Sequence, residues 1–311
     1  MTRVLLTGAS GFIGRGALAP LLAAGLEVHA VSTRPAPPWS PPGVVWHMAN
    51  LLNAGSELLL KALRPSQLLH FAWDAKPGYF WTSEANLRWV EASLRLLSAF
   101  ADGGGERAVL AGTCAEYEWR DETHCVEGVT PTAPGTLYGA AKNGLHSVAE
   151  GHSRRHGYGL AWGRIFFTFG PFEDEGRLGG SVASALAAGR TARTTHGEQL
   201  RDFLYAPELA EAFVALLRSD VTGPVNVASG RPTAMKEFVH SLAEAVGRPE
   251  LVELGARPAS LSEPRVLTAD VSRLRDEVGW VPTRSLTEAA RDTMAWWSSR
   301  QSERIDGARG G

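Results

Sequence analysis

The chain has 311 residues, of which 44% are hydrophobic and 21% charged, so it can bury a sizeable core and is not a disordered protein. Its formal net charge of −2 argues against a dedicated nucleic-acid-binding protein, which would carry a basic surface. No stretch approaches the roughly 18 apolar residues that a membrane-spanning helix needs, so we expect no membrane partner.

The first half of the chain alternates between short apolar runs and longer segments with helical spacing. We predict strands at residues 4–6, 28–31, 44–46, 68–72 and 108–111, and helices at 13–24 and 83–100. Apolar strands joined by helix-length connections are typical of a parallel sheet that is covered on both faces. The predicted fold class is therefore α/β, a doubly wound parallel sheet of the Rossmann type.

The second half of the chain begins with a glycine-rich stretch at 169–180. Runs at 203–205 and 225–227 are expected to be strands that return to the sheet, with a helix at 207–217 between them. Further helices are expected at 181–189, 233–246 and 286–297.

These elements suggest two domains. We assign residues 1–165, with the returning segment 203–228, to a dinucleotide-binding domain. A smaller C-terminal α/β substrate-binding domain is assigned to 166–202 and 229–300. Residues 301–311 are polar and glycine-rich, and we expect them to form a flexible tail.

Three glycines stand where the first predicted strand gives way to the first helix. They belong to the segment Thr7-Gly8-Ala9-Ser10-Gly11-Phe12-Ile13-Gly14. Glycine lets the backbone turn sharply and approach a pyrophosphate, whose charge then lies at the helix N-terminus. The position of the triplet favours a dinucleotide-binding turn over a tight turn without a ligand.

The end of the second predicted strand indicates which dinucleotide is bound. An acidic residue there would accept hydrogen bonds from the adenosine ribose and repel a 2′-phosphate. The segment is instead Val31-Ser32-Thr33-Arg34, with no acid and with a guanidinium that can pair with a phosphate. We therefore favour NADP(H), with NAD(H) as the alternative in case Arg34 is only a solvated loop residue.

The strongest chemical signal is the segment Tyr138-Gly139-Ala140-Ala141-Lys142. With five tyrosines and four lysines in the chain, a pair at this spacing is expected by chance only about 0.06 times. A spacing of four residues puts both side chains on one face of a helix. Because a neighbouring ammonium and an oxidised nicotinamide both favour the phenolate, we expect a lowered pKa for Tyr138, which then acts as acid and base.

Thr113 follows the predicted strand 108–111 and is expected at the carboxyl end of the sheet, where ligands bind in such folds. Its hydroxyl is suited to hydrogen-bond the oxygen that gains or loses hydride. Cys114 comes next and, with His124 and Cys125, raises the alternatives of covalent catalysis or a metal site. Lone cysteines are more often packing residues, so we predict no metal.

Together these residues resemble the extended short-chain dehydrogenase/reductase family, the group of NDP-sugar epimerases, dehydratases and ketoreductases. The resemblance runs from Thr7 to Trp297. Beyond the glycine turn and the Tyr138–Lys142 pair, it is carried by His70-Phe71-Ala72, Asn86, Arg164, Gly170-Pro171, Arg201-Asp202-Phe203-Leu204-Tyr205, Asp270-Val271-Ser272 and Gly279-Trp280-Val281-Pro282.

The resemblance implies roles for these residues. Tyr138 is then the acid/base, Lys142 holds the nicotinamide ribose and Thr113 orients the reacting oxygen. The substrate is implied to be a nucleotide-activated sugar, with Arg201 and Arg265 on its diphosphate unless they form structural ion pairs. Cys114 is implied to line the substrate site. The implied cofactor contacts include Ser10, Phe12, Ile13, Ser32, Asn50, Leu51, Phe71 and Ala72.

Departures from the family pattern narrow the reaction. The 4,6-dehydratases carry an Asp-Glu pair, or at least the Glu, directly after the threonine, whereas this chain has Cys114 and Ala115 there and Glu116 one residue late. Dehydration is therefore not expected. Phe167 stands where many members have an asparagine that touches the substrate phosphates, so the diphosphate is expected to be held differently.

We favour reduction of an NDP-keto-(deoxy)sugar, because NADP(H) suits a reductant that is consumed and exchanged. The alternatives are an NDP-sugar 4-epimerase that retains NAD, and a catalytically silent protein that only senses the cofactor.

The segment 73–89 is rich in aromatic residues and lies at the rim of the predicted cleft, but we assign none of its rings as ligands.

The resemblance also implies a homodimer, formed through the helices that begin near Ser83 and Tyr138.

The two cysteines fit a reducing compartment better than a disulfide scaffold. A strand-like run begins at Val4 and leaves no room for a signal peptide, so we expect a cytoplasmic protein.

Overall fold

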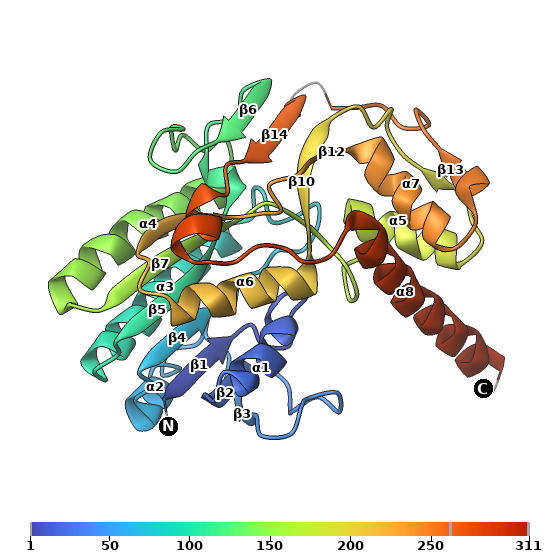
Figure 1. Ribbon diagram of the computed structural model, residues 1–311. Helices are drawn as coiled ribbons and strands as arrows, with labels where there is room; N and C mark the ends of the chain where they lie inside the picture. Colours follow the sequence, from blue (N-terminus) through green and yellow to red (C-terminus); the bar gives the residue numbers. More distant parts are fainter. Residues whose placement is uncertain (1, 261–262, 310–311) are drawn as a thin grey trace.

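A computed structural model of the chain describes residues 2–260 and 263–309. Figure 1 shows a large sheet flanked by helices and, beside it, a smaller region that ends in a long C-terminal helix. Within the described residues the large sheet contains the strands β1 (Arg3–Thr7), β2 (Glu27–Ser32), β3 (Val45–Met48), β4 (Gln67–His70), β5 (Arg107–Thr113), β7 (Gly159–Ile165) and β11 (Gly223–Val227).

The strand order of this sheet is β11-β7-β5-β4-β1-β2-β3, and every neighbouring pair is parallel. The chain proceeds from β1 to β2 and β3 on one side, then crosses back and places β4 on the other side of β1. At such a reversal the carboxyl ends of the two strands border the crevice in which ligands bind. The predicted doubly wound α/β fold is confirmed.

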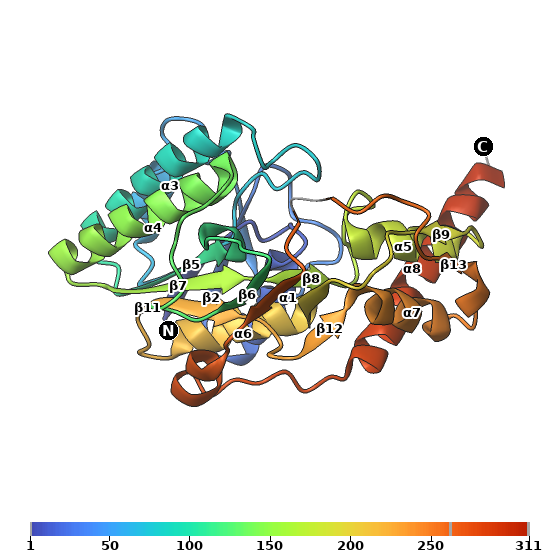
Figure 2. The ribbon, with the colours of Figure 1, turned by 90° about the horizontal axis from the view of Figure 1, so that it is seen from above.

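Successive residues of the strands pack against helices on opposite faces of the sheet. Val4 and Leu6 belong to a core shared with α1 (Gly14–Ala23) and α6 (Ala206–Arg218). Leu5 belongs to a second core on the opposite face. The helices of this face are α2 (Leu58–Leu63), α3 (Ala85–Asp102) and α4 (Leu137–His156). Figure 2 shows α3 and α4 on one side of the sheet and α1 and α6 on the other.

Helix α4 carries the predicted catalytic pair, and its start is fixed by a side-chain cap. The Thr136 hydroxyl accepts a hydrogen bond from Gly139 N at 3.1 Å. The helix ends at Gly157, whose φ of +75° lies in the left-handed region that favours glycine. The cap therefore places Tyr138 in the first turn, at the end of α4 that meets the carboxyl ends of the strands.

A second sheet contains β12 (Pro232–Ala234), β10 (Leu200–Tyr205), β14 (Val266–Ala269) and β6 (Glu122–Cys125), with β8 (Phe167–Phe169) paired to β10. The prediction that residues 203–205 return to the large sheet is wrong, because β10 pairs with β8, β12 and β14. The return is made by α6, whose Leu209 and Phe213 enter the core of the large sheet, and by β11.

The smaller region has a core of its own around Phe169, Phe203 and Tyr205. Its elements are α5 (Leu178–Ala187), α7 (Met235–Ala245), α8 (Leu286–Arg309) and the two-stranded pair β9 (Ala192–Arg193) and β13 (Val252–Glu253). Helix α8 continues past its predicted end at 297 and through the predicted tail to Arg309, and residues 310–311 lie outside the described residues.

Candidate active site

The glycine turn lies at the reversal point between β1 and β4, and each glycine has its own steric cause. Gly8 has a φ of +69°, and a Cβ there would lie 2.8 Å from the backbone nitrogen of Ala72. A Cβ on Gly14 would lie 2.3 Å from Gly8 O, and one on Gly11 3.1 Å from the same oxygen. Ser10 and Gly11 are exposed, so the N-terminal backbone of α1 is accessible to an anion.

A buried set of hydrogen bonds holds the loop after β4 against this turn. Thr7 Oγ1 lies 2.6 Å from His70 Nδ1 and accepts from Ala72 N at 3.4 Å. His70 Nε2 lies 3.0 Å from the Ser93 hydroxyl. Burial, aided by the charge of Lys142, lowers the pKa of His70 to about 3, so the imidazole is neutral. The predicted contacts Phe71 and Ala72 thus lie beside the turn.

The residues predicted at the adenosine end lie around the end of β2. Ser32 is buried, and its hydroxyl lies 3.5 Å from that of Ser10. Arg34 is exposed, and its backbone nitrogen donates to Ser32 Oγ at 3.0 Å. The Asn50 side chain is instead engaged in its own turn, where Oδ1 accepts from Leu52 N at 3.0 Å. Leu51 is buried. Phe12 and Ile13 are half-buried in the turn itself.

Thr113, Tyr138 and Lys142 come together at the carboxyl end of β5. The Thr113 side chain hydrogen-bonds the Tyr138 phenol. Lys142 is 4% exposed and its Nζ donates to Ala111 O at 2.8 Å, two residues before Thr113. The three groups therefore form one cluster, in which a hydroxyl and a phenol face the same edge of the sheet.

Aromatic residues from the segment 73–89 surround the Tyr138–Lys142 pair. The ring of Tyr138 makes edge contacts with Trp73, Phe80 and Trp81, at centroid distances of 6.4, 4.8 and 5.8 Å. Lys142 Nζ lies 3.8 Å from the centroid of the Trp73 ring, a cation–π contact. We assigned none of these rings to the site, so their contact with both members of the pair is new.

The electrostatics of the pair differ from our expectation. Burial raises the pKa of Tyr138 to about 12, against the hydrogen bond from Thr113, which lowers it. Burial lowers the pKa of Lys142 to about 7, against the charge of Glu116, which raises it. The expected lowering of the Tyr138 pKa depends on a bound oxidised nicotinamide as well as on the ammonium, so it stays a prediction, and in the protein alone the effect of burial dominates. Tyr138 is a protonated phenol near neutral pH.

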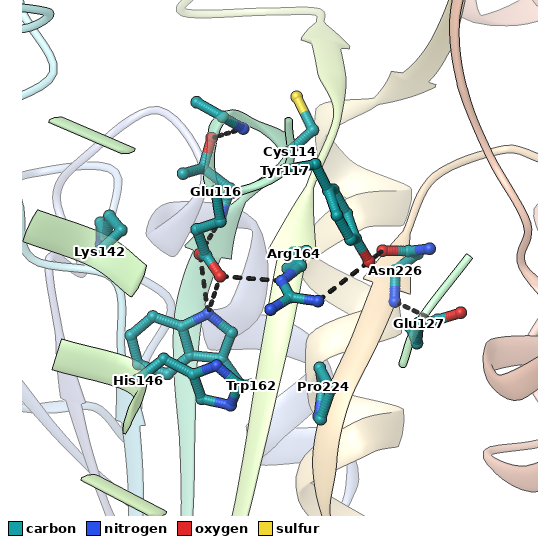
Figure 3. Close-up of polar contacts among 12 residues, drawn as sticks. Cys114, Glu116, Tyr117, Glu127, Lys142, His146, Trp162, Arg164, Pro224 and Asn226 are labelled. Carbon is teal, nitrogen blue, oxygen red and sulfur yellow. Dashed lines mark hydrogen bonds and ion pairs between the residues drawn. The ribbon is translucent and has the colours of Figure 1, made fainter. Parts of the chain in front are cut away.

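Our sequence reasoning noted Glu116 only as a displaced acid, yet it is the centre of a buried polar network. It is completely buried and accepts hydrogen bonds from Trp162 Nε1 and from Arg164 Nε, each at 2.8 Å. Arg164 in turn donates to the Tyr117 hydroxyl at 3.0 Å, and Tyr117 donates to Asn226 Oδ1 at 2.7 Å. Figure 3 shows the Glu116 carboxylate pointing toward the Trp162 indole and the Arg164 guanidinium.

The residues predicted to contact the substrate are not all in the cluster. Cys114 follows Thr113 and is 7% exposed, and burial raises the pKa of its thiol, which disfavours a nucleophile. Arg201 is 1% exposed and donates to Glu263 at 2.8 Å. Arg265 is exposed and forms ion pairs with Asp121 and Glu122. Both arginines thus have carboxylate partners, and their role on a diphosphate stays a prediction.

The described part of the chain contains neither a candidate metal-binding cluster nor a candidate membrane-spanning helix. Within residues 2–260 and 263–309, no group of three or more His, Cys, Asp or Glu side chains could hold a metal ion. In the same residues no helix combines the length and the apolar character needed to cross a membrane.

Comparison with known proteins gives a family and relatives of similar length. The profile of the NAD dependent epimerase/dehydratase family matches residues 4–228. A UDP-glucose 4-epimerase from Streptomyces lividans is 26% identical over 328 residues, which cover 96% of each chain. A dTDP-6-deoxy-L-talose 4-dehydrogenase (NAD(P)(+)) from Kitasatospora kifunensis is 30% identical over 307 residues, which cover 93% of this chain and 94% of the relative.

A solved structure agrees with these relatives. The crystal structure of the UDP-glucose 4-epimerase of Thermus thermophilus in complex with NAD has a TM-score of 0.82 and 25% sequence identity to this chain. The alignment covers 95% of this chain and 99% of the epimerase. The similarity therefore includes the smaller region as well as the large sheet.

Proposed function

This chain belongs to the NAD dependent epimerase/dehydratase family, and from that premise we propose that it is an NAD(P)-dependent oxidoreductase that reduces a ketone of a nucleotide-activated sugar. The observation that carries the proposal is the cluster of Thr113, Tyr138 and Lys142, in which Tyr138 is a protonated phenol. The relative from Kitasatospora kifunensis, a 4-dehydrogenase, supports it, because ketone reduction is the reverse of alcohol oxidation.

In the proposed reaction the side chains of the site transfer one proton to the substrate. Tyr138 donates its phenolic proton to the carbonyl oxygen of the sugar as that oxygen gains negative charge. The Thr113 hydroxyl, already hydrogen-bonded to the phenol, orients the same oxygen. Lys142 supplies a buried positive charge one helical turn from Tyr138, which favours the phenolate left after the transfer. When bound, the nicotinamide supplies the hydride that completes the alcohol.

The residues around the glycine turn fit a dinucleotide. The surroundings of Gly8 and Gly14 leave no room for a Cβ and those of Gly11 leave little, and the exposed backbone at the start of α1 is suited to a pyrophosphate. Ser10, Phe12, Ile13, Phe71 and Ala72 would line this end, and Tyr138 and Lys142 the nicotinamide end. For the adenosine end we propose that Arg34 pairs with a 2′-phosphate, which makes NADPH the preferred reductant.

Dehydration is disfavoured by the environment of Glu116. An elimination needs an acid and a base that reach the substrate. Glu116 has no exposed surface, and its carboxylate accepts hydrogen bonds from Thr113 N, Trp162 and Arg164. Cys114 is a buried thiol with a raised pKa, and Ala115 has no ionisable group. These residues support a reaction that only transfers hydride and a proton.

Epimerisation at C4 is the second candidate, because the relatives from Streptomyces lividans and Thermus thermophilus are UDP-glucose 4-epimerases. An epimerase must keep its cofactor between the two hydride transfers, whereas a reductase must exchange it. The cofactor content of the purified protein therefore separates the two. Tightly retained NAD supports the epimerase, and rapid exchange of added NADPH supports the reductase.

The proposal extends to the substrate and to the assembly. A nucleotide diphosphate needs cationic side chains, and we retain Arg201 and Arg265 as candidates that would have to exchange their carboxylate partners for phosphate. We also propose a homodimer through α3 and α4, because Leu87 and Val148 are 56% and 53% exposed on these helices.

The proposed function is tested by NADPH oxidation with a panel of nucleotide keto-sugars. We expect turnover with at least one member, and none with the parent sugars that lack a ketone. Absence of oxidation with the whole panel would overturn the reductase, and if no nucleotide sugar is epimerised either, despite NADPH binding, it would favour a protein that only senses the cofactor.

A further inference from the structure

Glu116 is a fully buried carboxylate next to Thr113, and the proposed reaction does not use it. Its Oε1 accepts from Thr113 N at 2.8 Å, while the Thr113 hydroxyl accepts from Ala115 N at 3.2 Å, so the two residues form a capping box at the start of the 3₁₀-helix Cys114–Glu116. Because all its partners donate, the group is an ionised carboxylate. The position of Thr113 therefore depends on that of Glu116.

Neighbouring residues make room for this carboxylate and hold it. A Cβ on Gly112 would lie 2.1 Å from Trp162 Nε1 and 2.6 Å from Glu116 Oε1, so only glycine permits the indole–carboxylate contact. His146 of α4 stacks on Trp162 at a centroid distance of 4.8 Å and an angle of 20°. In Figure 3 these rings lie on one side of Glu116, and Arg164 and Tyr117 on the other.

The charge of Glu116 acts on both members of the catalytic pair. It raises the pKa of Lys142, which favours the ammonium, and it raises the pKa of Tyr138, which favours the phenol. The other ionisable groups near Lys142 do not replace it, because His70 on β4 is neutral. Arg164 on β7 pairs with Glu116 itself. The effect on Lys142 favours the ammonium, which stabilises the phenolate left after Tyr138 has donated its proton.

We propose that Glu116 is the positioning residue of this site: its carboxylate fixes Thr113 through the backbone N–H, and its negative charge favours the ammonium form of Lys142. The proposal rests on the proposed reduction, and it adds a residue that touches neither substrate nor cofactor.

The charge can be tested without any substrate. The chain has four lysines, Lys61, Lys76, Lys142 and Lys236, and only Lys142 is buried. A pH titration followed by NMR, with ¹³C at lysine Cε and the Lys142 signal identified in K142M, gives its pKa directly. We expect a midpoint near 7 in the wild type. In E116Q we expect it lower by about one pH unit, and in E116D nearly unchanged.

The positioning can be tested by activity. E116D keeps the charge but is too short to bond Thr113 N and Arg164 together, so we expect kcat about tenfold lower with a nearly unchanged KM for the sugar. A Lys142 midpoint that does not move in folded E116Q would overturn the electrostatic role, and wild-type kcat in E116D would overturn the positioning role. If E116Q does not fold, kcat of E116D still tests the positioning role. If no keto-sugar is reduced, the proposed function fails, while the titration still tests Glu116.

Discussion

Replacing Gly112 by alanine should destabilise the protein through one identifiable contact. The added Cβ would lie 2.1 Å from Trp162 Nε1 and 2.6 Å from Glu116 Oε1, distances at which atoms must move. Trp162 and Glu116 have no exposed surface, so neither can move into solvent. Overpacking costs about 1–3 kcal/mol and losing a buried hydrogen bond to a charged group about 1.5–3 kcal/mol, so we expect a loss of roughly 3 kcal/mol.

Thermal unfolding followed by tryptophan fluorescence measures this loss. At roughly 2 °C per kcal/mol for a chain of this size, Tm should fall by about 6 °C. Gly135→Ala is the matched control, because a Cβ there meets no atom within 4 Å, and its Tm should change by about 1 °C or less. A Gly112→Ala protein with the Tm of the control would refute the steric argument. It would mean that the indole–carboxylate contact is not formed as described.

Three further substitutions test separate parts of the proposal. Tyr138→Phe removes the proton donor, so we expect kcat to fall by about 10³-fold while the Kd for NADPH, from fluorescence titration, changes little; near-normal turnover would exclude the assigned role. Arg34→Ala should weaken NADPH binding about 10- to 100-fold and NADH binding hardly at all, because one charge-assisted hydrogen bond contributes about 1.5–3 kcal/mol; equal losses would remove the argument for NADPH. Leu87→Arg should convert the proposed dimer to monomers in sedimentation velocity, and an unchanged dimer would place the interface elsewhere.

The parts of the site that depend on local spacing could be predicted from the sequence. The glycine turn follows a strand and begins a helix, and Tyr138 and Lys142 are one helical turn apart. Both motifs can therefore be predicted without knowing which distant residues contact them. The sequence predicted the class of the large sheet, doubly wound and parallel, but not its full strand order, because no strand was predicted at β7. Its sequence contains two glycines, a tryptophan and an arginine, a composition that does not indicate a buried strand. Trp162 and Arg164 are tolerated there because Glu116 accepts their hydrogen bonds.

The errors share a physical cause, which is the contact of residues far apart in the chain. Trp162 and Arg164 follow Glu116 by 46 and 48 residues, so no local sequence pattern could predict that they bind it. The pKa of Tyr138 was expected to fall because of Lys142 and an oxidised nicotinamide, whereas in the protein alone burial of the phenol beside the rings from 73–89 raises it. Strand β10 was assigned to the wrong sheet because its apolar run does not reveal which strand it will pair with.

The route of the chain through the large sheet affects how the protein can be made. Its edge strand β11 and one covering helix, α6, come only after the chain has passed through β8, α5 and β10. During synthesis the large sheet therefore cannot be completed until Val227 has left the ribosome. In a fragment that stops at Ile165, core residues such as Val4 and Leu6 lack their partners Leu209 and Phe213. The smaller region is consequently not a separable unit: exchanging it between relatives requires three junctions, one before β8, one after β10 and one after β11.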